Sequence, residues 1–230
     1  MKAINENIYV SDQDLTVLGI AMGARMTVIR LSNNNLIIHS PNKFSESLAA
    51  EVTELGECAT IFSPNKMHNL YVEDWIRCFP KAKAFAPFSI ADRNSYTFLE
   101  PSIITTIENQ WQNELEIVYL DGMPALKEYV LYHPKSKTLI VTDCIFNLHN
   151  RPGITSNILL KLNGAHNRTG PSRLFKAAIK DKELFAQSLQ KILQWDFETI
   201  ILSHGDIIEA NGKNIFLKAF KQYLPLHEYQ

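Results

Sequence analysis

The sequence has few cysteines, almost no net charge and no long apolar run. Its three cysteines, Cys58, Cys78 and Cys144, are widely spaced and form no CxxC pair, which favours buried thiols in a reducing cytosol over disulfides. Lys and Arg total 23 against 24 Asp and Glu, so no basic excess attracts a phosphate backbone and we expect no nucleic-acid partner.

Segments that would direct the chain to a membrane are also missing. No apolar stretch approaches the roughly 20 residues needed to cross a bilayer. The opening MKAINENIYVSD lacks the apolar core of a signal peptide. We therefore expect a cytoplasmic protein without a membrane partner.

The remaining composition is that of an ordinary globular protein. Hydrophobic residues make up 46% and charged residues 20% of the 230 positions, which excludes a disordered chain. We see no internal repeat and no linker rich in Pro, Gly or Ser. The sequence therefore predicts one domain over residues 1–230.

Strand and helix patterns come in two blocks. Apolar stretches at 26–31 and 36–39 flank Ser-Asn-Asn-Asn, and because asparagine tolerates positive φ this predicts an antiparallel hairpin. The other predicted elements are strands at 7–10, 59–62, 83–86, 117–120, 129–132, 138–142 and 199–202, and helices at 45–55, 70–78, 154–162, 172–178, 181–195 and 212–224. Helices follow each block of strands, which favours an α/β fold with two sheets face to face, a four-layer α/β/β/α sandwich, over a doubly wound parallel sheet.

Three predicted strands are followed by side chains that can ligate a metal. His68 lies in the polar loop after 59–62, Asp143 follows 138–142, and His204 follows 199–202. Strand ends often gather catalytic groups, and imidazole and carboxylate both bind Zn²⁺, Fe²⁺ or Mn²⁺. Gly205 allows a sharp turn that would aim His204. Taken singly, each residue also has a structural explanation, such as a cap or a satisfied loop histidine.

The chain resembles the metallo-β-lactamase-like superfamily over nearly its whole length, and four segments carry the resemblance. LYHPKSKTLIVTD, at 131–143, resembles the hairpin that ends in a metal-bridging aspartate, and ETIILSHGD, at 198–206, resembles the last motif, whose histidine binds the second metal. GARMTVIRLSNNNLIIHSP and SPNKMHNLYVEDW resemble an uncharacterised branch of the superfamily. The resemblance implies the four-layer sandwich.

The resemblance also implies a degenerate metal site. The four ligand positions of the family's His-x-His-x-Asp-His loop fall on Pro64, Lys66, His68 and Asn69, and the next motif histidine falls on Met123. Proline has no donor atom and lysine is a cation, so the first metal site should be empty. The second site keeps His68, Asp143 and His204, with Asn69 as a weaker candidate.

The expected function is that of a metal-dependent hydrolase-like protein with one divalent metal, Zn, Fe or Mn, and an unknown small-molecule substrate. Asp143 would ligate the ion and orient the water that the ion activates. The alternative is a non-catalytic descendant of the fold, without metal, that binds a small molecule or a partner.

Other polar residues give weaker signals. His39 ends an apolar strand, and a structural role is favoured for it. His133 precedes Pro134 in a predicted turn and is expected to be exposed. Arg168 and Arg173 lie in a basic loop that could hold an anionic group, although a solvated loop is the preferred interpretation.

Overall fold

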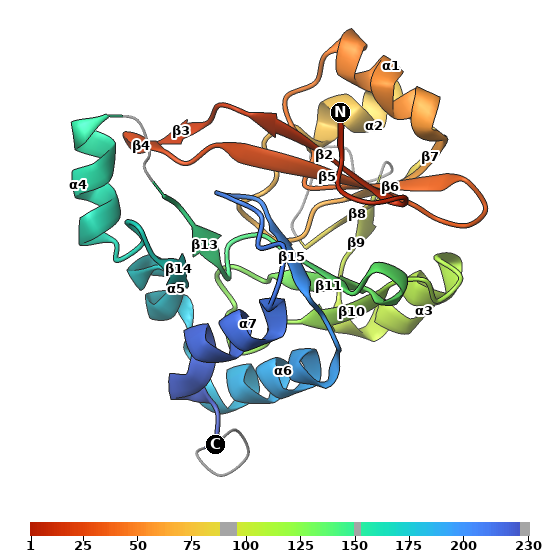
Figure 1. Cartoon of the computed structure of the whole chain (residues 1–230). Coiled ribbons are helices and arrows are strands. Elements are labelled where there is room, and N and C mark those ends of the chain that lie inside the picture. The colour runs from red at the N-terminus through yellow and green to blue at the C-terminus, as the bar shows by residue number, and fades with distance from the viewer. Residues whose placement is uncertain (88–95, 150–152, 226–230) are drawn as a thin grey trace. The chain divides into compact units, whose positions relative to one another are not determined.

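The computed structural model describes residues 1–87, 96–149 and 153–225 (Figure 1). The chain forms two compact units, each built on its own β-sheet. The first unit comprises residues 1–13 and 24–113, and the second comprises residues 14–23 and 114–230.

The sheet of the first unit has seven strands in the order β1-β2-β5-β6-β7-β8-β9. They are β1 (Lys2–Ala3), β2 (Ile8–Gln13), β5 (Ala24–Arg30), β6 (Asn35–His39), β7 (Glu57–Phe62), β8 (Lys83–Ala86) and β9 (Thr97–Phe98). The β5–β6 pair is antiparallel, as the asparagine turn predicts, and Asn34 takes a φ of 64° in that turn. From β6 to β9 the strands run parallel, so the carboxyl ends of β6, β7 and β8 share one edge.

Two helices cover one face of this sheet. They are α1 (Glu46–Leu55), which Ser45 caps through its side chain, and α2 (Val72–Cys78). Val52 of α1 and Trp75 of α2 pack into a buried cluster with Val28, Ile38 and Ile61 of the strands. A third helix, α3 (Ile104–Gln110), follows a 3₁₀ turn at Pro101–Ile103 and was not predicted from the sequence.

The second unit has a four-stranded sheet in the order β10-β11-β12-β15. These strands are β10 (Glu116–Tyr119), β11 (Tyr129–His133), β12 (Thr138–Val141) and β15 (Thr199–Leu202). The β11–β12 hairpin turns through a 3₁₀ segment at Pro134–Ser136 and Lys137, whose φ is 49°. Because β15 runs parallel to β12, the residues that follow both strands meet at one edge of the sheet.

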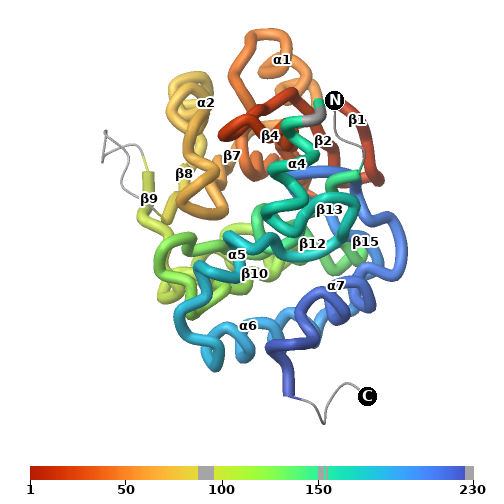
Figure 2. Tube along the Cα trace, turned by 90° about the vertical axis from the view of Figure 1, so that its left-hand side faces the viewer, coloured from red at the N-terminus to blue at the C-terminus, as the bar shows by residue number. Residues whose placement is uncertain are grey.

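Helices cover one face of the second sheet as well. The helices of this unit are α4 (Ile154–Leu162), α5 (Arg173–Ala178), α6 (Lys182–Gln194), α7 (Gly212–Phe220) and a 3₁₀ turn at Lys221–Tyr223. Phe185 of α6 and Phe216 of α7 pack with Val130 and Leu202 of the sheet, and α6 and α7 lie beside each other in both views (Figures 1 and 2).

Two short strand pairs complete the second unit. One is β3 (Thr16–Val17) with β4 (Ile20–Ala21), and the other is β13 (Phe146–Asn147) with β14 (Thr169–Gly170). In the part of the chain that the structure describes, no helix is both long and apolar enough to cross a membrane.

The expectation that His133 is exposed is wrong. Its exposed fraction is 1%, because it ends β11 inside the sheet rather than in the turn. Its Nδ1 lies 2.7 Å from Ser136 Oγ, and burial lowers the pKa of its ring. His133 is therefore part of the buried sheet structure.

Candidate metal centre

The loop after β7 is held by its own polar side chains. Ser63 Oγ donates a hydrogen bond to the carbonyl oxygen of His68 at 2.6 Å. Asn65 Oδ1 accepts from the backbone N–H groups of Met67 and His68, at 2.8 and 3.0 Å. Ser63 and Asn65 are both fully buried, so the backbone that carries His68 is fixed from beneath.

A serine at the end of the neighbouring strand sets the orientation of the His68 ring. Ser40, directly after β6, places its Oγ 2.6 Å from His68 Nδ1. Ser40 is itself held by a hydrogen bond from its N–H to the carbonyl oxygen of Phe62. Metal-binding histidines commonly engage one ring nitrogen in this way, which directs the other nitrogen to the ion. In His68 the other ring nitrogen is Nε2.

His39 lies beside this arrangement as a buried neutral ring. Its exposed fraction is 1%, and it stacks on Phe62 with ring centroids 5.9 Å apart. Neither of its ring nitrogens has a hydrogen-bond partner among the described residues. Burial, with a smaller effect of His68, lowers the pKa of His39 to about 3. His39 is therefore uncharged at neutral pH.

In the second unit, a buried glutamate holds the loop that carries Asp143. Glu128 Oε1 accepts hydrogen bonds from the N–H groups of Thr142 and Cys144, at 3.0 and 3.3 Å. These two amides flank Asp143, so its backbone is held on both sides. Burial raises the pKa of Glu128 to about 7, and the nearby charge of Asp143 adds to this rise. Sequence reasoning missed Glu128; its only local signal is an acid just before the apolar strand β11.

His204 has a defined tautomer. It is the second residue after β15, directly after Ser203. Its Nδ1 lies 2.7 Å from the carbonyl oxygen of Gly23, and because a carbonyl only accepts, Nδ1 carries the proton. The lone pair of the neutral ring is then on Nε2. Phe146 stacks on the ring at 5.6 Å and 10°, so the imidazole is clamped on its face as well as at its edge.

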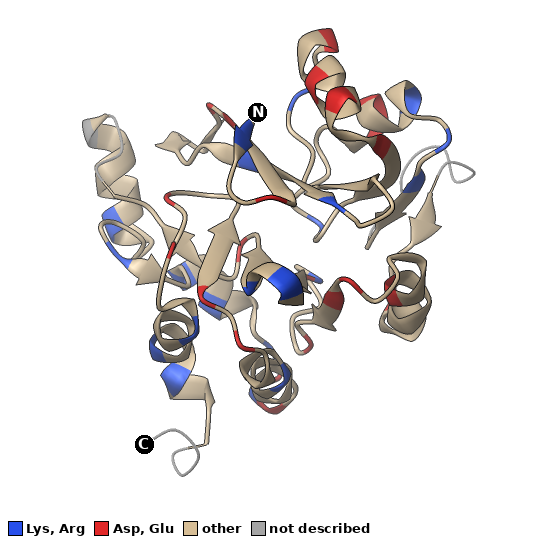
Figure 3. Cartoon of the chain, turned by 45° about the vertical axis from the view of Figure 1, so that its right-hand side comes forward, with Lys and Arg blue, Asp and Glu red and all other residues tan. Residues whose placement is uncertain are grey.

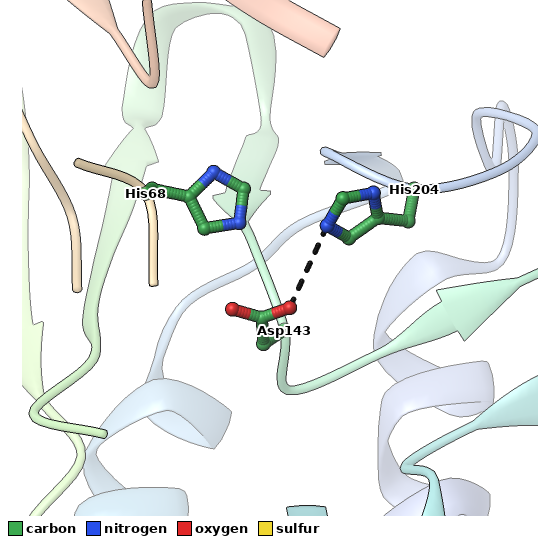
Figure 4. A group of neighbouring side chains, drawn as sticks. All are labelled: His68, Asp143 and His204. Atoms are coloured by element: carbon green, nitrogen blue, oxygen red, sulfur yellow. Dashed lines mark ion pairs between the residues drawn. The ribbon is translucent and has the colours of Figure 1, made fainter. Parts of the chain in front are cut away.

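His204 Nε2 faces the carboxylate of Asp143. Nε2 lies 3.6 Å from Asp143 Oδ1, the pair joined by the dashed line in Figure 4, which also draws His68. This separation is longer than an ordinary hydrogen bond. Two ligand atoms at about 2.1 Å from one tetrahedral ion lie about 3.4 Å apart, so the pair is spaced as two ligands of the same metal would be.

The glycine after His204 is required by its surroundings. Gly205 has a φ of +104°, and a Cβ built there would lie 2.2 Å from the carbonyl oxygen of Asn147. That carbonyl accepts a hydrogen bond from the N–H of Asp206, which ties the turn to β13. The predicted sharp turn at Gly205 is therefore present, and no other residue fits it without moving the backbone.

Four positions carry a residue other than the family's metal ligand, and their surroundings in the structure differ. Met123 has an exposed fraction of 0% and belongs to the hydrophobic cluster of the second unit. Pro64 is buried, Lys66 is half-buried and Asn69 is exposed. Met123 is therefore a core residue, and the role suggested for Asn69 stays a prediction.

Comparisons with solved structures identify the fold. A metallo-β-lactamase from Pontibacter korlensis matches with a TM-score of 0.60 and 11% identity, covering 96% of this chain and 97% of that chain. One from Erythrobacter litoralis matches with a TM-score of 0.60 and 13% identity, covering 96% and 91%. FIM-1 from Pseudomonas aeruginosa, in the mono-zinc form, matches with a TM-score of 0.55 and 12% identity, covering 97% and 96%. The chain has a metallo-β-lactamase-like α/β fold, as the sequence predicted.

A comparison with models of protein families identifies the family of this chain. Residues 5–170 match the family described as "Domain of unknown function (DUF4336)", and the chain belongs to this family. The match runs through parts of both compact units. The comparison with curated proteins finds no match.

Proposed function

We propose that this protein is a metal-dependent hydrolase that binds one divalent metal ion through His68, Asp143 and His204. The observation that carries the proposal is the 3.6 Å separation of His204 Nε2 and Asp143 Oδ1, together with the tautomer that Gly23 imposes on His204. His68 is the third proposed ligand, because its Nδ1 lies 2.6 Å from Ser40 Oγ and its other ring nitrogen, Nε2, is the candidate donor. The likeness to a metallo-β-lactamase spans 96% of the chain, so it includes the segments that carry all three residues and supports the proposal.

The chemistry of the donor set fits a divalent metal. Two neutral imidazoles and one carboxylate suit Zn²⁺, and the same set suits Fe²⁺ or Mn²⁺. When such a metal is bound, it lowers the pKa of a coordinated water to about 7. The stacked ring of His204 and the clamped loop of Asp143 hold two donors in place before any ion arrives, which reduces the entropy cost of binding.

Other proposed roles of individual residues are to orient the water and to hold the ligands in position. Asp143 contributes one oxygen as a ligand and orients the attacking water. Glu128 fixes the two amides on either side of Asp143, so that its carboxylate keeps its direction. Ser40 and Gly23 hold the Nδ1 atoms of the two histidines, as such outer partners do in metal sites generally.

A single metal is proposed because the other site has lost its donors. Met123 is part of the hydrophobic core, and Pro64 offers no side-chain donor. A member of the same fold, FIM-1, is described in a mono-zinc form, which supports one zinc as a state that the fold accepts. These lost positions also favour the alternative, in which the chain binds a small molecule or partner without catalysis.

Metal content and turnover separate the two possibilities. The untagged protein should purify with at most one equivalent of metal, and Zn²⁺, Mn²⁺ or Fe²⁺ should support hydrolysis in a screen of phosphoesters, thioesters, esters and lactams. His204→Ala should abolish the activity. His166→Ala removes a histidine from a half-buried loop of the same unit and serves as the matched control. No bound metal and no metal-dependent turnover would favour the non-catalytic binder.

A further inference from the structure

An unusual set of exposed apolar side chains lies on the second unit. Its members come from the β3–β4 hairpin, from α4 and from the start of α5. We call this set the leucine face; it consists of Val17, Leu18, Ile158, Leu162 and Leu174. Leu18 is 87% exposed, Leu174 69% and Leu162 64%, which is far more than a folded chain needs to leave in water.

Hydrogen bonds connect the three elements that carry the leucine face. Ala21 N–H donates to Ser156 Oγ at 3.0 Å, so β4 lies against α4, as Figure 1 also shows. At the other end of α4, the N–H groups of Arg173 and Leu174 donate to the backbone and side-chain oxygens of Asn163, at 2.8 and 3.1 Å. The hairpin, α4 and the first turn of α5 are therefore neighbours within this unit.

The tip of the hairpin holds a leucine where the backbone disfavours one. Leu18 and Gly19 have φ values of 50° and 81°, both in the left-handed region. A two-residue turn of this type normally takes Asn, Asp or Gly, because a side chain on a left-handed residue is strained. Since Leu18 is also almost fully exposed, it contributes little to packing within the chain. A strained, exposed leucine points to a contact outside the chain.

The same part of the chain carries charge of one sign. Residues 144–180 contain no Asp or Glu. The cations of this stretch that the structure describes are Lys161, Arg168, Arg173, Lys176 and Lys180. Figure 3 shows blue segments along the stretch from α4 to α5. The overall net charge of −1 therefore hides a basic stretch that includes α4 and α5, two of the three elements of the leucine face.

We propose that the leucine face binds the surface of an anionic lipid bilayer. Leu18, Leu162 and their neighbours would enter the boundary between headgroups and acyl chains, while the cations contact the anionic headgroups. Each Lys or Arg near such a surface contributes about fivefold to the affinity. A nucleic acid would satisfy the cations, but it would leave the exposed leucines and isoleucine in water, so a bilayer accounts for both features.

This proposal does not conflict with the missing membrane span. The expectation of no membrane partner rested on the lack of a spanning or targeting segment, and neither is needed for binding at the surface. The proposal also uses none of the candidate metal ligands, so it stands or falls independently of the proposed function.

Vesicle co-sedimentation of the full chain tests the proposal. Vesicles of phosphatidylcholine with about one third phosphatidylserine should bind the protein, phosphatidylcholine alone should bind it at least about tenfold less, and added salt should release it. Leu18→Asn should weaken binding about tenfold or more, because it removes the tip leucine. Asparagine accepts the left-handed backbone, so this variant should fold at least as well as the wild type. Lys161→Gln with Arg168→Gln should weaken binding by about 25-fold.

Two controls and a spectroscopic measurement complete the design. Leu184→Gln changes a leucine of α6 that is 39% exposed, and Lys218→Gln changes a cation of α7. Neither residue belongs to the leucine face, so both variants should bind anionic vesicles as the wild type does. In Leu18→Trp, fluorescence should shift to the blue on anionic vesicles, and since Trp75, Trp111 and Trp195 are buried, the shift would report the hairpin tip.

Three results would overturn the proposal. One is the absence of binding to anionic vesicles by the folded wild type. Another is binding that Leu18→Asn and the double Gln variant leave unchanged. The third is binding to a soluble polyanion such as heparin without binding to vesicles, which would assign the cations to a different partner.

Discussion

Acidification should destabilise this protein through His39. The ring has an ordinary pKa of 6.5 in the unfolded chain and a pKa of about 3 in the folded one, because it is buried without a hydrogen-bond partner among the described residues. Between these two values the unfolded chain binds the proton and the folded chain does not. The free energy of unfolding therefore falls as the pH falls. From pH 7 to pH 5 this one group should remove about 2 kcal/mol of stability.

Urea unfolding at a series of pH values measures this loss. The wild type should lose about 2 kcal/mol more between pH 7 and pH 5 than His39→Leu, which has no titrating group at this position. Other shifted groups, such as His133, are present in both proteins and cancel in the difference. Ile38→Leu, a change on the same strand without a titrating group, should keep the pH dependence of the wild type. Parallel pH profiles for the wild type and His39→Leu would refute the account of His39.

Two further predictions concern the architecture around the candidate centre, and a third concerns the unfolding of the whole chain. Glu128→Ala should lower the free energy of unfolding by about 2–4 kcal/mol, because two buried N–H groups lose their acceptor. Glu128→Gln keeps a carbonyl acceptor and should cost clearly less. Equal losses in chemical unfolding would argue against Glu128 as the acceptor that holds this loop. Gly205→Ala should cost at least about 2 kcal/mol, since its Cβ meets the Asn147 carbonyl oxygen, and an unchanged melting temperature would contradict the geometry. We predict that residues 1–230 unfold as one domain, so fluorescence and circular dichroism should give one coincident transition, and two separate transitions would assign the units to independent domains.

Much of the fold was predictable where turn and cap chemistry is explicit in the sequence. The Ser-Asn-Asn-Asn turn defined the β5–β6 hairpin. The predicted helices at 45–55 and 181–195 start one residue before α1 and α6, at Ser45 and Asp181, whose side chains accept hydrogen bonds from N–H groups of the first turn. The β3–β4 hairpin was missed because a leucine occupies its left-handed tip, where the expected turn residues are Asn, Asp or Gly.

The residues that support the candidate centre were harder to predict. Glu128 acts through hydrogen bonds to Thr142 and Cys144, 14 and 16 positions away, and no local pattern reveals such contacts. The turn signal at Pro134 suggested an exposed His133, but the position of a side chain in a sheet depends on strand pairing over longer distances. Strand-end positions alone indicated His68, Asp143 and His204, whereas their hydrogen-bonded supports required the structure.

Isothermal titration with Zn²⁺ or Mn²⁺ at neutral pH tests the central claim most directly. The wild type should bind one ion per chain through His68, Asp143 and His204. His204→Ala should abolish this binding, and Asn69→His should tighten it, because imidazole is a better ligand than a neutral amide oxygen. The absence of binding, two tight sites in the wild type, or binding that survives His204→Ala would contradict the assignment of a single metal to these residues.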